Sequence, residues 1–195
     1  MKNLKIVTPF LMALFISTNA FSMNVSDGYK VGDKVSDFTI QNYNGADYTL
    51  SKSGANFTVI IFMSTTCPFV QPYTDRLNGL VKEFGSNGVA IWGINSNKTE
   101  STKEVMDHAA KKGYQFPVLK DESSSVADQF GAERTPEVFV IRNSDMTLMY
   151  HGRIDDDKSA ENVTSSDLKN ALISLNEGNE IAVKNTKAFG CTIKR

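Results

Sequence analysis

The sequence predicts an α/β fold with a mixed central sheet, helices on both of its faces and an N-terminal β-hairpin. Residues 58–63 form a continuous apolar, β-branched run, and the apolar period then becomes helical as far as Phe84. A second apolar run at residues 89–95 completes a βαβ unit. Further on, residues 137–141 and 146–150 flank a polar turn, which indicates an antiparallel pair of strands.

The other elements follow from turn residues and periodicity. Two short β-prone segments, residues 38–40 and 48–50, flank Asn44-Gly45 and predict the opening hairpin. A helix is predicted from Thr102 to Lys112, because Gly113 is a typical C-terminal stop. In chain order, the remaining predictions are a short strand at residues 116–119, a short helix at 123–130 and a last helix at 165–175.

The N-terminal segment differs in kind from the rest of the 195 residues. Two lysines precede an apolar stretch at residues 6–16, and small residues favour cleavage after Ser22, with Ala20 as the alternative. We therefore predict a signal peptide at residues 1–22 and one mature domain at residues 23–195, exported to the periplasm or secreted. A stable membrane anchor is not expected, because about 20 apolar residues are needed to span a bilayer.

The charge balance excludes one class of partner. Removing residues 1–22 takes away two lysines and no acidic residue, so the net charge changes from −1 to −3. The mature chain has no basic stripe, which argues against nucleic-acid binding. No motif predicts a cofactor or a metal site.

Cys67 is the best candidate for chemistry. It follows three small polar residues at the end of the first buried strand and directly precedes Pro68. The unpaired N–H groups and the dipole at a helix N-terminus favour the thiolate form of cysteine. Pro68 suits a first helical turn, whereas Pro72 predicts a kink or a delayed start of the regular helix.

Cys191 lies 124 positions after Cys67, in the tail that follows the last predicted helix. An even number of cysteines in an exported chain favours pairing, although a domain of this size does not need a disulfide for its core. Three roles remain open for Cys191. It could resolve a mixed disulfide on Cys67, form a permanent bridge that pins the tail, or stay a separate thiol.

Cys67-Pro68 and Thr135-Pro136, each at the edge of a predicted strand, belong to a longer pattern. The pattern continues through residues 94–97, 134–139, 152–156 and 190–194. Taken in order, these segments resemble the redoxin (AhpC/TSA-like) branch of the thioredoxin superfamily, in particular its exported thiol–disulfide members. The resemblance extends from about residue 31 to residue 194. It implies a thioredoxin-like fold, a nucleophilic Cys67 and a cis-proline at Pro136 that faces it.

The residues before that proline belong to the predicted site. A cis X-Pro bond bends the chain and removes a donor, so backbone near Thr135 and Pro136 is free to pair with an extended substrate. The alternative is an ordinary trans proline that opens an edge strand. Arg134 could bring its guanidinium near the sulfur and favour the thiolate, or pair on the surface with Glu133 or Glu137.

The chain departs from two well-known patterns of the superfamily. Val70 stands where thioredoxins carry their second cysteine, so a Cys-x-x-Cys mechanism is excluded. Thr66 stands in place of their tryptophan. Ile60 and Ser64 stand where peroxiredoxins carry a proline and a threonine, seven and three residues before the reactive cysteine. This difference argues against efficient peroxidase activity.

The resulting hypothesis is an exported thiol–disulfide oxidoreductase. Cys67 would attack a disulfide or sulfenate of a protein or small-molecule substrate, and Cys191 or an external reductant would resolve the mixed disulfide. One alternative is an atypical thiol peroxidase, in which peroxide oxidises Cys67 to a sulfenic acid. Another is a non-enzymatic thioredoxin-like binding module or metallochaperone.

Overall fold

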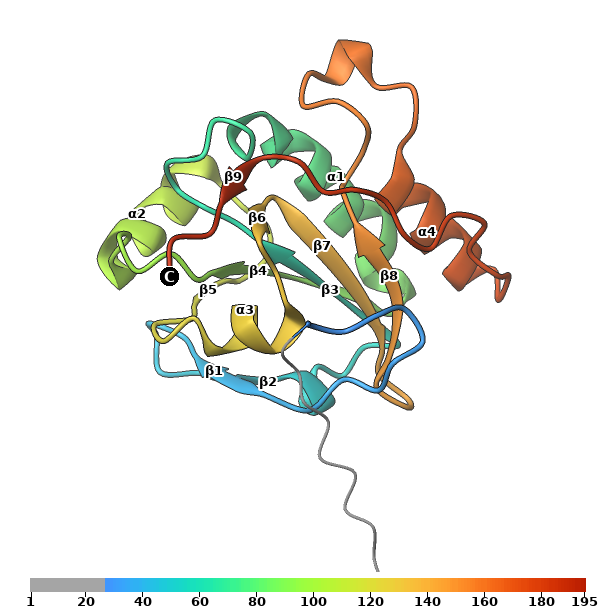
Figure 1. Cartoon of the computed structure of the whole chain (residues 1–195), viewed down its shortest axis with the longest axis horizontal. Helices are drawn as coiled ribbons and strands as arrows, with labels where there is room; N and C mark the ends of the chain where they lie inside the picture. Colours follow the sequence, from blue (N-terminus) through green and yellow to red (C-terminus); the bar gives the residue numbers. More distant parts are fainter. Residues whose placement is uncertain (1–26) are drawn as a thin grey trace, which may run out of the picture.

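The computed structural model describes residues 27–195, so the predicted signal peptide and its cleavage site lie outside the described residues. A five-stranded sheet with the order β5-β4-β3-β7-β8 forms the centre of the fold (Figure 1). Its strands are β3 (Phe57–Phe62), β4 (Val89–Asn95), β5 (Val118–Lys120), β7 (Glu137–Arg142) and β8 (Thr147–Gly152).

The sheet is mixed, as the sequence predicts. Strand β3 is parallel to β4 and antiparallel to β7, β5 extends the parallel half, and β8 extends the antiparallel half. Within this register, Ile60 of β3 lies between Trp92 and Phe139. The carboxyl end of β3, where the chain continues toward Cys67, is therefore in the middle of the sheet.

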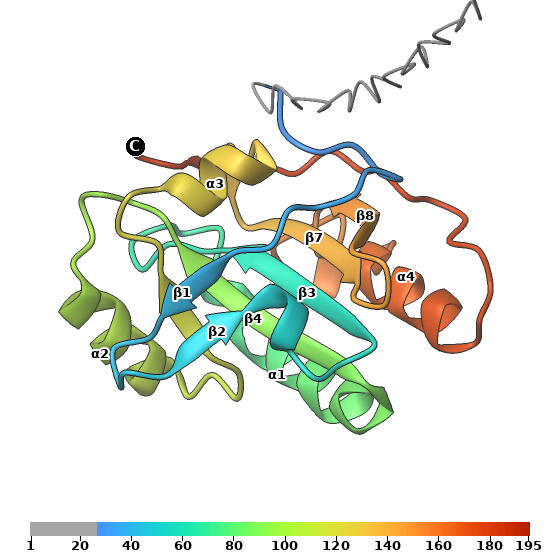
Figure 2. The ribbon, with the colours of Figure 1, turned by 90° about the horizontal axis from the view of Figure 1, so that it is seen from below.

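Helices cover both faces of the sheet (Figure 2). Val59 and Ile61 of β3 pack on one face with α1 (Thr74–Phe84), α2 (Thr102–Lys112) and α4 (Asp167–Asn176). Ile60 and Phe62 belong to the other core, which α3 (Ser125–Phe130) and the hairpin of β1 (Thr39–Gln41) and β2 (Asp47–Thr49) cover. The alternation of side chains along a strand explains why β3 is apolar throughout. No helix within residues 27–195 is long and apolar enough to cross a membrane.

The connection from β3 to α1 differs from the simple strand-to-helix junction expected. A turn at residues 68–70 and a 3₁₀-helix at Gln71–Tyr73 precede α1, so regular α-helix begins only at Thr74. Pro72 lies in this 3₁₀ segment, and the missing N–H and fixed ring of proline are poorly tolerated inside an α-helix. The predicted delay is confirmed, and it separates Cys67 from the N-terminus of α1.

Two short strands were not predicted. Strand β6 (Arg134–Thr135) pairs in antiparallel fashion with β9 (Cys191–Thr192) near the C-terminus. Before reaching β9, the C-terminal segment runs along the edge of β8, where Asn185 bridges to His151 (dark red, Figure 1). The other 3₁₀-helices are at Leu50–Lys52, Gly85–Asn87 and Ala160–Asn162.

Candidate active site

The two cysteines lie together although 124 positions separate them in the sequence. Cys67 follows the carboxyl end of β3, and Cys191 is the first residue of β9. Their Sγ atoms are 2.6 Å apart, and both thiols are free. Cys67 is 1% exposed, whereas Cys191 is half-buried.

Thr135 and Pro136 form the wall beside the Cys67 sulfur. The peptide bond between them is cis, as the family resemblance implied. The Cys67 thiol donates a hydrogen bond to the carbonyl oxygen of Thr135, with 3.1 Å between Sγ and the oxygen. Thr135 also pairs with Cys191 in the β6–β9 register, so the same residue contacts one cysteine and aligns the other.

The chain around Cys191 is held from two sides. On one side, β9 pairs with β6, and the Ile193 N–H donates to the Glu133 carbonyl at 2.9 Å. On the other side, the Lys98 N–H donates to the Lys194 carbonyl at 2.8 Å, and the Lys194 N–H donates to Asn97 Oδ1 at 2.8 Å. The Ile193 side chain is buried in the core that α3 covers. These contacts fix the backbone position from which Cys191 reaches Cys67.

Gly190 permits the close approach of the two segments. Its φ of +145° lies in a region that favours glycine, and a Cβ atom there would overlap the Thr135 carbonyl group. That carbonyl is the one that faces Cys67 Sγ. A glycine is thus required beside Cys191 by the same packing that forms the site.

The two thiols have unequal proton affinities. Burial raises the pKa of Cys67, but hydrogen bonds from the Cys191 side chain and from the Cys191 and Phe69 N–H groups outweigh it and lower the pKa below its usual value. Burial, together with the hydrogen bond and the charge of Cys67, raises the pKa of Cys191 to about 11. Cys67 is therefore the more acidic thiol of the pair, and Cys191 holds its proton more strongly. These hydrogen bonds replace the expected effect of the helix terminus.

Arg134 does not contact the sulfur in the way the sequence suggested. Its side chain is exposed and Nη1 donates to Thr192 Oγ1 at 3.0 Å, which links β6 to β9. Its backbone N–H donates to Glu137 Oε2 at 2.8 Å, and the Glu133 N–H donates to the same oxygen at 2.7 Å. Arg134 thus supports the segment that carries Cys191, while Glu137 shapes the turn before the cis-proline.

Glu100 is a site residue that the sequence analysis missed. It is 3% exposed. Its carboxylate accepts hydrogen bonds from the loop that joins β3 to Cys67 and from two asparagines at and after the end of β4. The donors and their distances are Ser64 Oγ at 2.6 Å, the Thr65 N–H at 2.8 Å, Thr66 Oγ1 at 2.8 Å and Asn97 Nδ2 at 3.1 Å, together with Asn95 Nδ2. Burial raises the pKa of Glu100, but these donors outweigh it and lower the pKa to about 2.

The carboxylate of Glu100 therefore ties the loop before Cys67 to the segment after β4. Because Asn97 also accepts the Lys194 N–H, one cluster of hydrogen bonds supports both cysteine-bearing segments. A sequence signal for this cluster did exist: the buried strand β4 ends at Asn95, Ser96 and Asn97 follow it directly, and buried polar side chains need partners. Nothing in the sequence distinguished Glu100 from the exposed Glu104 as that partner.

Two half-buried aromatic rings lie beside the cysteines. The rings of Phe69 and Phe189 meet edge to face, with centroids 6.2 Å apart, and each ring belongs to a residue two positions from one of the cysteines. Lys158 Nζ lies over the Phe69 ring, 4.9 Å from its centroid. Pro68, between Cys67 and Phe69 in the chain, is exposed.

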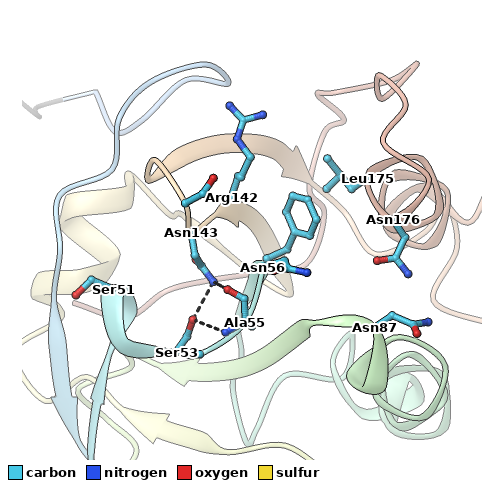
Figure 3. Close-up of a pocket in the computed structure, with 12 residues that line it drawn as sticks. Ser51, Ser53, Ala55, Asn56, Asn87, Arg142, Asn143, Leu175 and Asn176 are labelled. Atoms are coloured by element: carbon cyan, nitrogen blue, oxygen red, sulfur yellow. Dashed lines mark hydrogen bonds between the residues drawn. The ribbon is translucent and has the colours of Figure 1, made fainter.

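A separate pocket lies away from the two cysteines. It has a volume of about 890 Å³ and is lined near the start of β3 and the end of β7, whereas Cys67 follows the opposite end of β3. Its lining is mainly serine and asparagine, and Asn143 there donates to Ser53 Oγ and to the Ala55 carbonyl (Figure 3). It contains neither cysteine.

A match to the AhpC/TSA family covers residues 31–151, which is more than half of the chain. The chain belongs to the AhpC/TSA family. It is thus a redoxin of the thioredoxin superfamily, and its fold is thioredoxin-like, as the resemblance implied. The matched residues include Cys67, Glu100 and Pro136 but end before the tail that carries Cys191.

Solved structures and relatives agree with this family. A hypothetical protein from Sinorhizobium meliloti 1021 is 30% identical, with a TM-score of 0.78, and the alignment covers 87% of this chain and 96% of that one. An uncharacterised conserved protein from Geobacillus kaustophilus has the same identity and TM-score, and the alignment covers 87% of this chain and 94% of that one. Peroxidoxin BcpB from Mycobacterium tuberculosis is 25% identical, with a TM-score of 0.59, over 76% of this chain and 97% of that one.

A relative with a named activity supports the redox class. The thiol-disulfide oxidoreductase ResA from Halalkalibacterium halodurans is 23% identical over 122 residues, which are 63% of this chain and 68% of that protein. Family membership and this relative support a redox enzyme of the thiol–disulfide kind.

Proposed function

We propose that this redoxin is an exported thiol–disulfide oxidoreductase in which Cys67 and Cys191 interchange between a dithiol and a disulfide. The observation that carries the proposal is the 2.6 Å separation of the two sulfur atoms. A disulfide bond is about 2.05 Å long, so a small displacement is enough to form it. The route through Cys191 also accounts for the absence of a second cysteine at Val70.

The first step uses the thiolate of Cys67. It attacks one sulfur of a substrate disulfide, forms a mixed disulfide and releases the other substrate sulfur as a thiolate. Because Cys67 is 1% exposed, the unbonded Cys191 side chain must turn aside to admit the substrate. Protein and small-molecule disulfides are both candidate substrates.

Cys191 then resolves the mixed disulfide on Cys67. Once the Cys67 sulfur is bonded to the substrate, its negative charge is gone, and with it one cause that holds the pKa of Cys191 at about 11. Cys191 loses its proton, attacks the Cys67 sulfur and releases the second substrate thiolate. The substrate has then gained two electrons, and the enzyme holds a Cys67–Cys191 disulfide that an external reductant must reduce.

Peroxide chemistry is less well supported by the site. Ser64, which stands at the position of the peroxiredoxin threonine, donates its hydroxyl to Glu100 at 2.6 Å. Ile60 is buried in the core that α3 covers and cannot replace the peroxiredoxin proline. We therefore keep thiol–disulfide exchange as the function and treat peroxide consumption as an outcome of the test.

The test compares two serine variants of the mature protein. Cys67→Ser should abolish the reduction of oxidised glutathione and of insulin. Cys191→Ser should accumulate mixed disulfides on Cys67, visible by mass spectrometry and on non-reducing gels, because release must wait for an external thiol. Equal loss of stability in both variants with no trapped adduct would instead identify a structural bridge. Rapid peroxide consumption without disulfide reduction would favour the peroxidase.

A further inference from the structure

The two sulfur atoms of the site differ in access. Cys67 is 1% exposed, and its sulfur lies against Cys191 Sγ and the Thr135 carbonyl oxygen. Cys191 is half-buried at the start of β9, and the next residue, Thr192, is exposed. A reagent that arrives from solvent therefore reaches the Cys191 sulfur before it reaches the Cys67 sulfur.

In the dithiol form, rotation of the Cys191 side chain can expose the Cys67 sulfur, since no bond joins the two sulfurs. In the disulfide form the bond itself would keep the Cys191 sulfur over Cys67. The backbone behind Cys191 cannot easily move away, because β9 is paired with β6 on one edge and with Lys98 through Lys194 on the other. In the disulfide form, Cys191 therefore keeps the Cys67 sulfur covered.

We propose that the external thiol that regenerates the oxidised enzyme attacks the Cys191 sulfur, and that Cys67 is the leaving group. This inference rests on the proposed function, since it requires a Cys67–Cys191 disulfide. In the balanced step, an external thiolate forms a bond to Cys191 Sγ while the bond from Cys191 to Cys67 breaks and its electron pair goes to Cys67. A second external thiol then attacks the external sulfur of the mixed disulfide, which leaves Cys191 as a thiol and releases an external disulfide.

The surroundings of Cys67 suit a leaving group. The N–H groups of Phe69 and Cys191 donate toward its sulfur, and despite its burial the pKa of Cys67 is lower than usual. Thiols of lower pKa leave faster in exchange reactions. The sulfur that is harder to reach is therefore also the one better able to depart, and both properties direct the incoming thiol to Cys191. The cysteines then divide the cycle, with Cys67 receiving the oxidised substrate and Cys191 the reductant.

The experiment uses the oxidised, folded wild-type mature protein and glutathione as the thiol. A substoichiometric amount of glutathione is added, the mixture is quenched rapidly with acid, and the modified peptides are identified by mass spectrometry. We expect glutathione on Cys191 and a free thiol at Cys67. Glutathione mainly on Cys67 would overturn the inference. The same reaction in denaturant, where the tail no longer covers Cys67, should place glutathione on both cysteines.

A tail variant tests the cause of this preference. Ile193→Ala removes a buried side chain that anchors β9, so a several-fold larger share of glutathione should appear on Cys67. Ile40→Ala, a buried isoleucine of the N-terminal hairpin in the same core, should keep the wild-type distribution. An unchanged distribution in Ile193→Ala would contradict protection by the tail. Failure of the oxidised wild type to contain a Cys67–Cys191 disulfide would instead refute the proposed function itself.

Discussion

Cys191 faces Thr135 across the β6–β9 pair, and this register places its sulfur 2.6 Å from that of Cys67. The pairing involves only two residues on each strand, yet it decides which atoms surround the reactive sulfur. Backbone next to the cis-proline, which we expected to be free for an extended substrate, is occupied by the chain's own tail. The two thiols therefore contact each other where that backbone would otherwise be open.

The first prediction concerns the acidity of Cys67. Cys191→Ala removes the side-chain hydrogen bond that favours the thiolate, so the pKa of Cys67 should rise relative to that in the wild type. The rate of Cys67 alkylation as a function of pH, followed on its own peptide, measures this change. Thr192→Ser, which changes the exposed neighbour but keeps the hydroxyl that accepts from Arg134, should leave the midpoint unchanged. A midpoint that stays the same in Cys191→Ala would show that Cys191 does not activate Cys67.

The second prediction concerns Gly190. In Gly190→Ala the new methyl group would overlap the Thr135 carbonyl, so β9 must shift away from β6. We expect a loss of about 2–3 kcal/mol in the free energy of unfolding, in line with strained non-glycine backbone, and disulfide formation slowed at least about tenfold.

Gly178→Ala provides the matched control. Gly178 also has a positive φ, of +73°, but no atom lies near its added methyl group. Its variant should lose some stability through backbone strain alone while forming the Cys67–Cys191 disulfide at the wild-type rate. Denaturant midpoints and the rate of thiol loss under a glutathione redox buffer distinguish the two variants. Equal rates of disulfide formation in both would contradict the role assigned to Gly190.

The third prediction concerns Glu100 and acid. Its folded-state pKa of about 2 is below the value of about 4.3 for an unfolded glutamate, so the group stabilises the fold fully above about pH 4.3. That contribution is lost as the pH falls from about 4.3 through about 2. Glu100→Gln should cost roughly 2–4 kcal/mol at neutral pH, because a neutral amide leaves buried donors without a partner. It should also flatten the dependence of stability on pH between these values.

Glu104→Gln is the control for that measurement. Glu104 caps the start of α2 from an exposed position, where glutamine can take over the same hydrogen bonds. Hydrogen bonds from Ser101 also lower the pKa of Glu104, but this group is exposed to solvent, so its variant should keep most of the wild-type acid dependence. Denaturant unfolding at a series of pH values gives the comparison, and an acid profile of Glu100→Gln that coincides with the wild type would remove Glu100 from this role.

The fourth prediction concerns export. The lysines and apolar stretch within residues 1–22 predict removal of that segment during export. N-terminal sequencing of the protein isolated from its native compartment should begin at or near Met23. Soluble cytoplasmic protein that retains Met1 would contradict both the signal peptide and the proposed place of the reaction.

Much of the fold follows from the sequence by itself. The helix predicted at Thr102–Lys112 has the same bounds in the structure, because Ser101 and Gly113 supply specific local caps. The strands of the central sheet were found because several consecutive apolar residues mark burial on both faces. The same run locates Cys67 just after the end of β3, and the delayed start of α1 follows from Pro72.

Only the tertiary structure decided how the site is assembled. Strands β6 and β9 have two residues each, which is too short for any hydrophobic period, and their pairing joins segments far apart in the chain. The same holds for the contact of Glu100 with the loop before Cys67. Local patterns report how a residue relates to its near neighbours, whereas these contacts depend on where the packed core places distant segments. The sequence alone therefore identified Cys67 as the reactive candidate, and the packing of the tail against β6 brought Cys191 to it.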